Sequence, residues 1–236
     1  MLPSFSPKQG KPQCATMLTR APSDIVQRLV DRVGQYDFDS EQFITYERSF
    51  YDTRRVVARD SRHKNKEQVY APADFDDDLM QVTQEVRDFI TTKVLPGNSH
   101  VLVQLACITP GQRLEWHIDS FLYQQYTQKI HVPIFTNAES VYAVYKDGVF
   151  LDVNMGVGEI WNINNLDMHS SINNGDTKRV HLIIDFMPTD TLAEFEATGL
   201  NYIHTPYPPA GQQMRKLYKE VHEAATAHYP ARANPN

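Results

Sequence analysis

Strand-like periodicity begins at Val101-Leu102-Val103-Gln104-Leu105-Ala106-Cys107-Ile108, which is followed by the turn signal Thr109-Pro110-Gly111-Gln112. The apolar run is typical of a buried strand, and its Pro and Gly stand where a type II turn requires them. Further short segments of this kind lie at 114–118, 129–134, 141–145, 149–153, 158–163 and 179–186. Many short strands with turn residues between them predict an antiparallel barrel or jelly roll.

The flanks of this strand-rich region are expected to be mostly helical. Helix start and stop signals and helical apolar spacing predict helices at 22–34, 74–96, 192–200 and 214–228. Aromatic and β-branched residues at 42–58 predict one or two strands. We expect a single domain over residues 1–236, with a mobile leader at 1–20, a helix and strand flank at 21–97, the β-barrel core at 98–190 and a helical flank at 191–236.

Composition and charge exclude several classes of protein. Hydrophobic residues make up 41% of the chain and charged residues 22%, which is typical of a soluble globular domain. The net charge of −6 argues against nucleic acid as the main partner, and the basic residues at 54–66 are interpreted as a solvated loop. Cys14 and Cys107 make no disulfide framework, no apolar run could span a bilayer and no secretory signal is visible, so we expect a cytoplasmic protein without a membrane partner.

Candidate metal ligands lie within the strand-rich region. His117 and Asp119 are separated by one residue in a predicted strand, so both side chains point to the same side. His169 follows after several predicted strands, which can bring it back to the same place. Two histidines and one carboxylate are the ligand set that binds iron(II) on one face and leaves the opposite positions open. Each residue alone has an ordinary structural interpretation, but together they predict a metal site.

Arg179 opens the last predicted strand of the region. Alternation places Arg179 inside the barrel and turns Val180 and Leu182 to the other face. A buried arginine needs an anionic partner, which a dicarboxylate co-substrate would supply in bidentate geometry. Pairing with Asp176 or Asp185 is the structural alternative.

Four phrases of the sequence carry a resemblance to a known family. They are Trp116-His117-Ile118-Asp119, Lys129-Ile130-His131-Val132-Pro133-Ile134, Gly158-Glu159-Ile160-Trp161, and His169-Ser170 together with Arg179-Val180-His181-Leu182-Ile183-Ile184-Asp185. Residues 101–188 resemble the 2-oxoglutarate/iron(II) oxygenases and, more narrowly, the aspartyl/asparaginyl β-hydroxylase family, whose relatives include hydroxylases of free proline. The resemblance implies a mainly β fold with flanking helices, the double-stranded β-helix of jelly-roll or cupin type.

The resemblance also implies a chemistry. Iron(II) would be held by the catalytic residues His117, Asp119 and His169, and 2-oxoglutarate by Arg179 at its distal carboxylate, with His131 nearby. The implied reaction is hydroxylation of an unactivated carbon while 2-oxoglutarate is decarboxylated to succinate, with O2 consumed and ascorbate as a reductant. The cofactor supplies the reactivity, and the protein supplies ligation, orientation and exclusion of water.

Asp119 narrows the expected substrate. Animal protein β-hydroxylases of this family lack the carboxylate ligand, so its presence favours the small-molecule members and an amino-acid-like substrate. It also argues against the halogenases, which leave that position open. The candidate substrate-binding residues are Lys129, Arg113 and Trp161, and Tyr123 and Tyr126 are candidates for a lid.

Three alternatives stay open from the sequence. The enzyme could hydroxylate an aspartyl, asparaginyl or prolyl residue in a protein. The barrel could be a cupin-like metal-binding module without turnover, although such a module has no need for the inward Arg179. Two histidines and a carboxylate can also hold zinc in a hydrolase, but no general base stands out at a defined spacing. The oligomeric state cannot be read, because the last amphipathic helix suits a dimer as well as the core.

Overall fold

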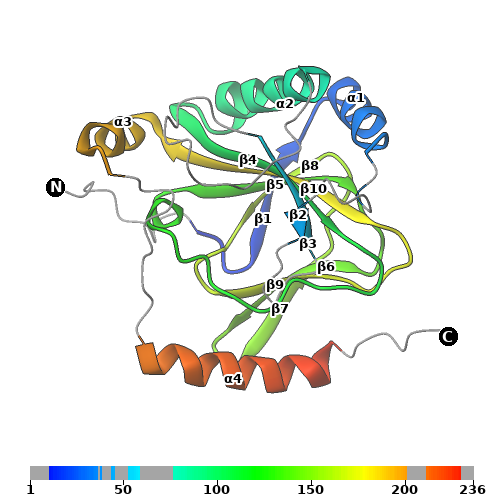
Figure 1. Cartoon of the computed structure of the whole chain (residues 1–236), viewed down its shortest axis with the longest axis vertical. Helices are drawn as coiled ribbons and strands as arrows, with labels where there is room; N and C mark the ends of the chain where they lie inside the picture. Colours follow the sequence, from blue (N-terminus) through cyan, green and yellow to red (C-terminus); the bar gives the residue numbers. More distant parts are fainter. Residues whose placement is uncertain are drawn as a thin grey trace.

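The computed structural model describes residues 11–36, 38, 44–45, 53–58, 77–200 and 211–229, whose strands form two antiparallel sheets (Figure 1). The larger sheet has the strand order β1-β8-β5-β10-β4-β3-β2. Its strands are β1 (Ala15–Arg20), β2 (Ile44–Thr45), β3 (Thr53–Ala58), β4 (Asn98–Ile108), β5 (Gln128–Phe135), β8 (Glu159–Ile163) and β10 (Arg179–Pro188). The smaller sheet, in the order β7-β6-β9, contains β6 (Ser140–Lys146), β7 (Val149–Val153) and β9 (Met168–Asn173). Together they form the predicted double-stranded β-helix.

Strand β10 lies in the middle of the larger sheet, between β4 and β5. Its register places Asp185 opposite Lys129 and Ile183 opposite His131. Because side chains opposite each other in an antiparallel pair share a face, these residues line one side of the sheet. The predicted alternation along this strand is confirmed, since Val180, Leu182 and Ile184 all belong to the core on the other face.

Two helices cover that outer face of the larger sheet (Figure 1). They are α1 (Ser23–Val33) and α2 (Asp77–Phe89), and α2 continues into a π-helical turn, Ile90–Val94. Leu29 of α1 and Leu79 of α2 are fully buried in the same core as Leu182. Burying one such side chain contributes about 1.5–3 kcal/mol, so this layer fixes the back of the barrel. Both helices confirm the sequence prediction, including the end of α1 at Gly34.

The segment before the metal-ligand pair is not the regular strand predicted at 114–118. It joins β9 through isolated bridges, Arg113 to Ile172 and His117 to His169, with a bend between them. His117 N donates to the carbonyl of His169 at 3.0 Å, and His169 N donates back at 2.9 Å. The bend lets Trp116 pack outward under the C-terminal helix while His117 keeps its backbone pairing with β9. The segment therefore extends the smaller sheet without regular strand geometry.

The last two helices pack on different parts of the barrel. Helix α4 (Gly211–His228) lies against the smaller sheet, where Val221 and Ala225 pack with Trp116 and Met168, as predicted for a helix on the outside of the barrel (Figure 1). Helical spacing puts Tyr218 on the apolar face of α4, but this residue is 39% exposed. Helix α3 (Thr189–Thr198) follows β10 directly. None of the helices in the described residues is long and apolar enough to cross a membrane.

The prediction of a mobile leader at 1–20 is wrong for its second half. Residues 15–20 form β1, an edge strand that pairs antiparallel with β8 from Ala15 opposite Ile163 to Arg20 opposite Glu159. This strand was not predicted because prolines and a glycine up to residue 12 indicate a loop. Most of its side chains are also only partly buried, so the apolar alternation typical of a strand is weak. Residues 1–10 of the predicted leader lie outside the described residues, as do the side chains of the basic stretch at 54–66.

Candidate metal centre

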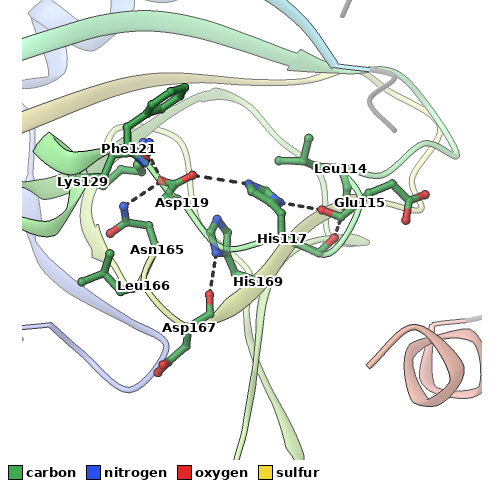
Figure 2. Close-up of polar contacts among 12 residues, drawn as sticks. Leu114, Glu115, His117, Asp119, Phe121, Lys129, Asn165, Leu166, Asp167 and His169 are labelled. Carbon is green, nitrogen blue, oxygen red and sulfur yellow. Dashed lines mark hydrogen bonds and ion pairs between the residues drawn. The ribbon is translucent and has the colours of Figure 1, made fainter. Parts of the chain in front are cut away.

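Three side chains from separate parts of the barrel meet at one point (Figure 2). His117 and Asp119 come from the bent segment and His169 from β9, and their candidate ligand atoms all lie within 4.8 Å of one another. Nε2 of His117 is 3.7 Å from Oδ1 of Asp119. The backbone bridge between the two histidines sets their spacing. The predicted cluster is therefore formed in space, although His169 lies far from His117 and Asp119 in the sequence.

Both histidines are oriented for metal binding by a backbone carbonyl two residues earlier in the chain. Nδ1 of His117 lies 2.7 Å from the carbonyl oxygen of Glu115, and Nδ1 of His169 lies 2.9 Å from that of Asp167. A carbonyl only accepts, so each Nδ1 carries the proton and each Nε2 keeps its lone pair. Burial lowers the pKa of His169, which favours the neutral ring that a metal requires. The donor set thus fits a divalent cation such as iron(II).

Asp119 is held so that one of its oxygens stays available. Its Oδ2 accepts a hydrogen bond from Nδ2 of Asn165 at 2.8 Å and lies 3.2 Å from Nζ of Lys129, while Oδ1 faces His117 (Figure 2). Asn165 also accepts the backbone N–H of Asp119. Burial alone would raise the pKa of Asp119, but the charge of Lys129 and the hydrogen bond from Asn165 hold it well below its usual range. The carboxylate is therefore ionised and presents a single oxygen to a metal.

Lys129 lies in a buried ion-pair network rather than on an open wall. Its ammonium is 3.2 Å from Asp119 Oδ2 and 3.2 Å from Asp185 Oδ1. Tyr123 donates its hydroxyl to Oδ2 of Asp185 at 3.1 Å. Burial opposes the charge on Lys129, yet the two carboxylates raise its pKa. A substrate contact of Lys129 stays a prediction, but its charge is already shared by two carboxylates.

The predicted tyrosine lid is wrong. The 3-10 turn Leu122–Gln125 carries Tyr123, which is 2% exposed and packs in a cluster with Phe195 of α3. Tyr126 meets the edge of Phe195 at 5.1 Å between ring centroids. Tyrosines can cover a site as a lid only if they can move away from it, and these two belong to a packed core.

Arg179 is buried at the opposite end of the inner face of β10 from Asp185, with 2% of its surface exposed. It pairs with no carboxylate among the described residues, since Asp185 is taken by Lys129. Its Nη2 donates instead to Nδ1 of His181 at 3.0 Å. Burial lowers the pKa of the Arg179 guanidinium. A buried guanidinium whose described partner is neutral leaves its charge uncompensated, so binding of an anion by Arg179 stays a prediction.

His181 is a residue that the sequence did not single out. Because arginine can only donate, Nδ1 of His181 is the acceptor, and the neutral ring carries its proton on Nε2. That nitrogen is buried and has no hydrogen-bond partner in the described part of the chain. An unpaired buried donor costs roughly 1–3 kcal/mol, so an acceptor at this end of the barrel would stabilise it.

His131 and Tyr142 connect the Arg179 end to the metal cluster. The distances between ring centroids are 5.5 Å from His131 to His181 and 5.8 Å from His131 to Tyr142. The centroid of the Tyr142 ring lies 5.7 Å from that of His169. Burial lowers the pKa of His131 well below its usual value, and Arg179 lowers it further. His131 therefore stays neutral between the metal cluster and Arg179, and its contact with the co-substrate stays a prediction.

The structure does not bring the other two predicted substrate residues to the metal. Arg113 donates to the backbone carbonyl of Tyr229 at 3.4 Å, beside α4. Trp161 shares a sheet face with His131, but its indole N–H donates to Glu159 at 2.9 Å. Substrate contacts for both remain predictions. Asn165, which orients Asp119, was missed because nothing in its sequence neighbourhood marks an amide as a partner of a distant carboxylate.

Comparisons with known proteins agree with this architecture. Neither a protein-family model nor a curated protein sequence matches the chain. Solved structures do match. A prolyl hydroxylase from Trichoplax adhaerens, in complex with a hypoxia inducible factor oxygen degradation domain peptide fragment, is similar over 77% of this chain and 86% of its own, with a TM-score of 0.52 and 8% sequence identity. AviO1 from Streptomyces viridochromogenes Tue57 is similar over 78% of this chain and 94% of its own, with a TM-score of 0.50 and 13% identity. The chain shares its fold with these proteins.

Proposed function

We propose that this protein is an iron(II)- and 2-oxoglutarate-dependent dioxygenase that hydroxylates an unactivated carbon of a small amino-acid-like substrate. The observation that carries the proposal is the metal cluster of His117, Asp119 and His169, whose donor atoms are already oriented for one cation. Two histidines and one carboxylate leave half of an octahedral coordination sphere open for other ligands. The sequence resemblance to the 2-oxoglutarate/iron(II) oxygenases and the fold shared with a prolyl hydroxylase support the same assignment.

Arg179 and His181 would bind the distal carboxylate of 2-oxoglutarate. The guanidinium offers a planar pair of N–H donors that matches a carboxylate, and Nε2 of His181 offers another. His131 and Tyr142 would line the path from this carboxylate to the metal. An iron ion with 2-oxoglutarate and O2 would supply the oxidising chemistry, while 2-oxoglutarate is converted to succinate and carbon dioxide. Ascorbate would serve as a reductant outside the cycle.

The protein's own part in the reaction is to orient the ligands and exclude water. The ion pair of Lys129 with Asp119 and Asp185 keeps the carboxylate ligand ionised and fixed. The buried inner face of β10 keeps the space beside the metal dry, which strengthens every electrostatic contact there. Within the superfamily, the aspartyl/asparaginyl β-hydroxylase family is the proposed relative, and Asp119 favours its small-molecule members.

Hydroxylation of a residue within a protein is the second candidate. It is favoured by one observation, that the similar prolyl hydroxylase was solved in complex with a peptide fragment. The two candidates share the metal and co-substrate sites and differ only in what stimulates turnover. A free amino acid would stimulate succinate formation in the first case, and only a peptide or protein would do so in the second.

Succinate release from 2-oxoglutarate tests the proposal. Purified protein with iron(II), ascorbate and O2 should form succinate, and His117→Ala and Asp119→Ala should abolish this activity. The matched controls are His222→Ala and Asp24→Ala, since these side chains are 62% and 76% exposed and lie on helices at the surface. If the wild type binds neither iron(II) nor 2-oxoglutarate, or if His117→Ala keeps full activity, the proposed function is wrong.

A further inference from the structure

The segment in front of β1 is fixed beside the loop that carries Asn165. The backbone N–H of Asn164 donates to the carbonyl of Cys14 at 2.8 Å, and its side-chain amide donates to the carbonyl of Gln13 at 3.3 Å. The pairing of Ala15 with Ile163 continues this contact into the larger sheet. Residues 11–14 are therefore a defined part of the wall near the metal centre.

Lys11 reaches from this segment toward the metal ligands. Its Nζ donates to Oδ1 of Asn165 at 2.5 Å. Nδ2 of the same amide donates to Oδ2 of Asp119 at 2.8 Å. Asn165 is fully buried and Lys11 is half-buried, so the ammonium lies only one side chain away from the carboxylate of the metal cluster.

Within the described part of the chain, the charge of Lys11 has no carboxylate partner. In the described ranges the ammonium bonds only to the neutral amide of Asn165, and the two nearby carboxylates, Asp119 and Asp185, are both paired with Lys129. Burial and the charge of Lys129 lower the pKa of Lys11 to about 8, against the attraction of the two carboxylates. Cations placed in the interior are normally paired, so this arrangement lacks an anion.

A count of charges gives the same result. Among the described residues, the cationic side chains of the site are Lys11, Lys129 and Arg179, and a bound divalent metal would add two positive charges. The anionic side chains among the same residues are Asp119 and Asp185, and bound 2-oxoglutarate would add two carboxylates. One positive charge is left over. Arg179 is matched by the co-substrate, so the unmatched cation is Lys11.

We propose that Lys11 binds a carboxylate of the substrate, and that the substrate is a free carboxylic acid of the amino-acid class. This inference rests on the proposed oxygenase function and adds the group by which the substrate is recognised. The sequence predicted Lys129 as a substrate-binding residue, but its charge is already neutralised by Asp119 and Asp185. The inference assigns the binding of the substrate carboxylate to Lys11 instead. A substrate bound there would complete the charge balance beside the metal cluster.

The inference predicts discrimination between an acid and its amide. A charge-assisted hydrogen bond at a partly dry site changes affinity by about tenfold or more, so a free amino acid should stimulate turnover at concentrations at least tenfold below those of its carboxamide. In Lys11→Met, which keeps the length of the side chain and removes the charge, this preference should disappear. Lys11→Arg keeps the charge and should retain a preference for the acid.

The experiment uses the full chain and a panel of free L-amino acids with their carboxamides. Succinate release gives KM for each compound, and calorimetry without O2, with manganese(II) and 2-oxoglutarate bound, gives the affinity of the acid independently of turnover. Lys219→Met is the matched control, because this lysine is 79% exposed on α4. The expected result is a KM and a Kd for the acid that are raised at least tenfold in Lys11→Met alone, with the Kd for 2-oxoglutarate changed less than about twofold.

Other outcomes overturn the inference in distinguishable ways. Stimulation by acid and amide at equal concentrations, or an unchanged KM for the acid in Lys11→Met, shows that Lys11 binds no substrate carboxylate. If Lys11→Met weakens metal binding and affects acid and amide alike, Lys11 only positions Asn165 and Asp119. If 2-oxoglutarate binds but no acid of the panel stimulates turnover, the substrate class is wrong while the oxygenase proposal stands. If neither metal nor 2-oxoglutarate binds, both proposals fall.

Discussion

Nζ of Lys129 lies 3.2 Å from Oδ2 of Asp119, so the carboxylate of the metal cluster has a cationic partner before any metal binds. The same ammonium neutralises Asp185, whose side chain is completely buried. Two carboxylates that share one lysine in a low-dielectric interior depend on it, because neither could stay ionised alone. The pair is thus a condition for the metal site as well as for the barrel.

Replacing Lys129 by methionine should destabilise the protein strongly. The variant leaves two carboxylates buried without a cation, and breaking such a network costs about 3–5 kcal/mol. Urea unfolding followed by circular dichroism measures this, with Lys219→Met as a surface control that should stay within about 0.5 kcal/mol of the wild type. Adding Asp185→Asn to Lys129→Met should recover part of the loss, which a double-mutant cycle quantifies. Equal urea midpoints for Lys129→Met and the wild type would show that the pair contributes nothing.

Asn165 should matter for metal affinity more than for stability of the fold. Its amide fixes Oδ2 of Asp119, and removing such a partner of a ligand weakens metal binding by about 10–100-fold. Competition between Asn165→Ala and a chelator for manganese(II) gives the affinity. Asn154→Ala is the matched control, since this asparagine donates to backbone carbonyls in the smaller sheet region. Unchanged manganese affinity in a folded Asn165→Ala protein would contradict the orienting role.

Much of the site follows from alternation along strands. A period of two separated Arg179 from Val180, and the structure agrees. The same period put His117 and Asp119 on one side, and their side chains do meet, although the segment is not a regular strand. Regular turn signals also placed most strands correctly. Strand β9, which carries His169, was not predicted as a strand, because Met168–Asn173 is buried on both faces and shows no alternation.

Pairings across the barrel could not be predicted in the same way. Lys129 and Asp185 are 56 positions apart, and only the register of β5 against β10 brings them together. That register depends on packing and on an irregularity in the pairing near Val180, neither of which leaves a local signal. Lys11 is a further case, since it precedes an edge strand that composition alone assigned to a mobile leader. Local patterns predict which face a side chain uses, but not its partner on that face.

Replacing Arg179 by glutamine should weaken 2-oxoglutarate binding. Two charge-assisted hydrogen bonds to the distal carboxylate are lost, which corresponds to about 30–100-fold in Kd. Calorimetry with manganese(II) in place of iron avoids turnover. The same variant should bind 2-oxobutyrate, which has no distal carboxylate, as well as the wild type does. His181→Phe should show the same selectivity with a smaller loss. Arg20→Gln, at a side chain 65% exposed, is the matched control. If Arg179→Gln loses the same factor of affinity for 2-oxoglutarate and for 2-oxobutyrate, Arg179 does not bind the distal carboxylate.

The apparent affinity for an acidic substrate should fall as pH rises through about 8. Lys11 binds an anion only when protonated, and burial has lowered its pKa to about 8 from the 10.5 of an exposed lysine. The groups that act on it are Asp185 and Asp119, which raise this pKa, and Lys129, which lowers it. Above the midpoint, KM for the acid should rise about tenfold per pH unit, since the protonated fraction falls by that factor.

Lys11→Arg isolates this effect from every other titration in the site. Arginine stays protonated throughout the accessible range, so the variant should lose the rise in KM above pH 8 while it keeps the preference for acid over amide. The ratio of the wild-type KM to the variant KM, followed from pH 6.5 to pH 9.5, then reports on the charge of residue 11 alone. A ratio that stays constant over this range would mean that the ammonium of Lys11 does not contact the substrate carboxylate, whatever the absolute pH profile of the enzyme.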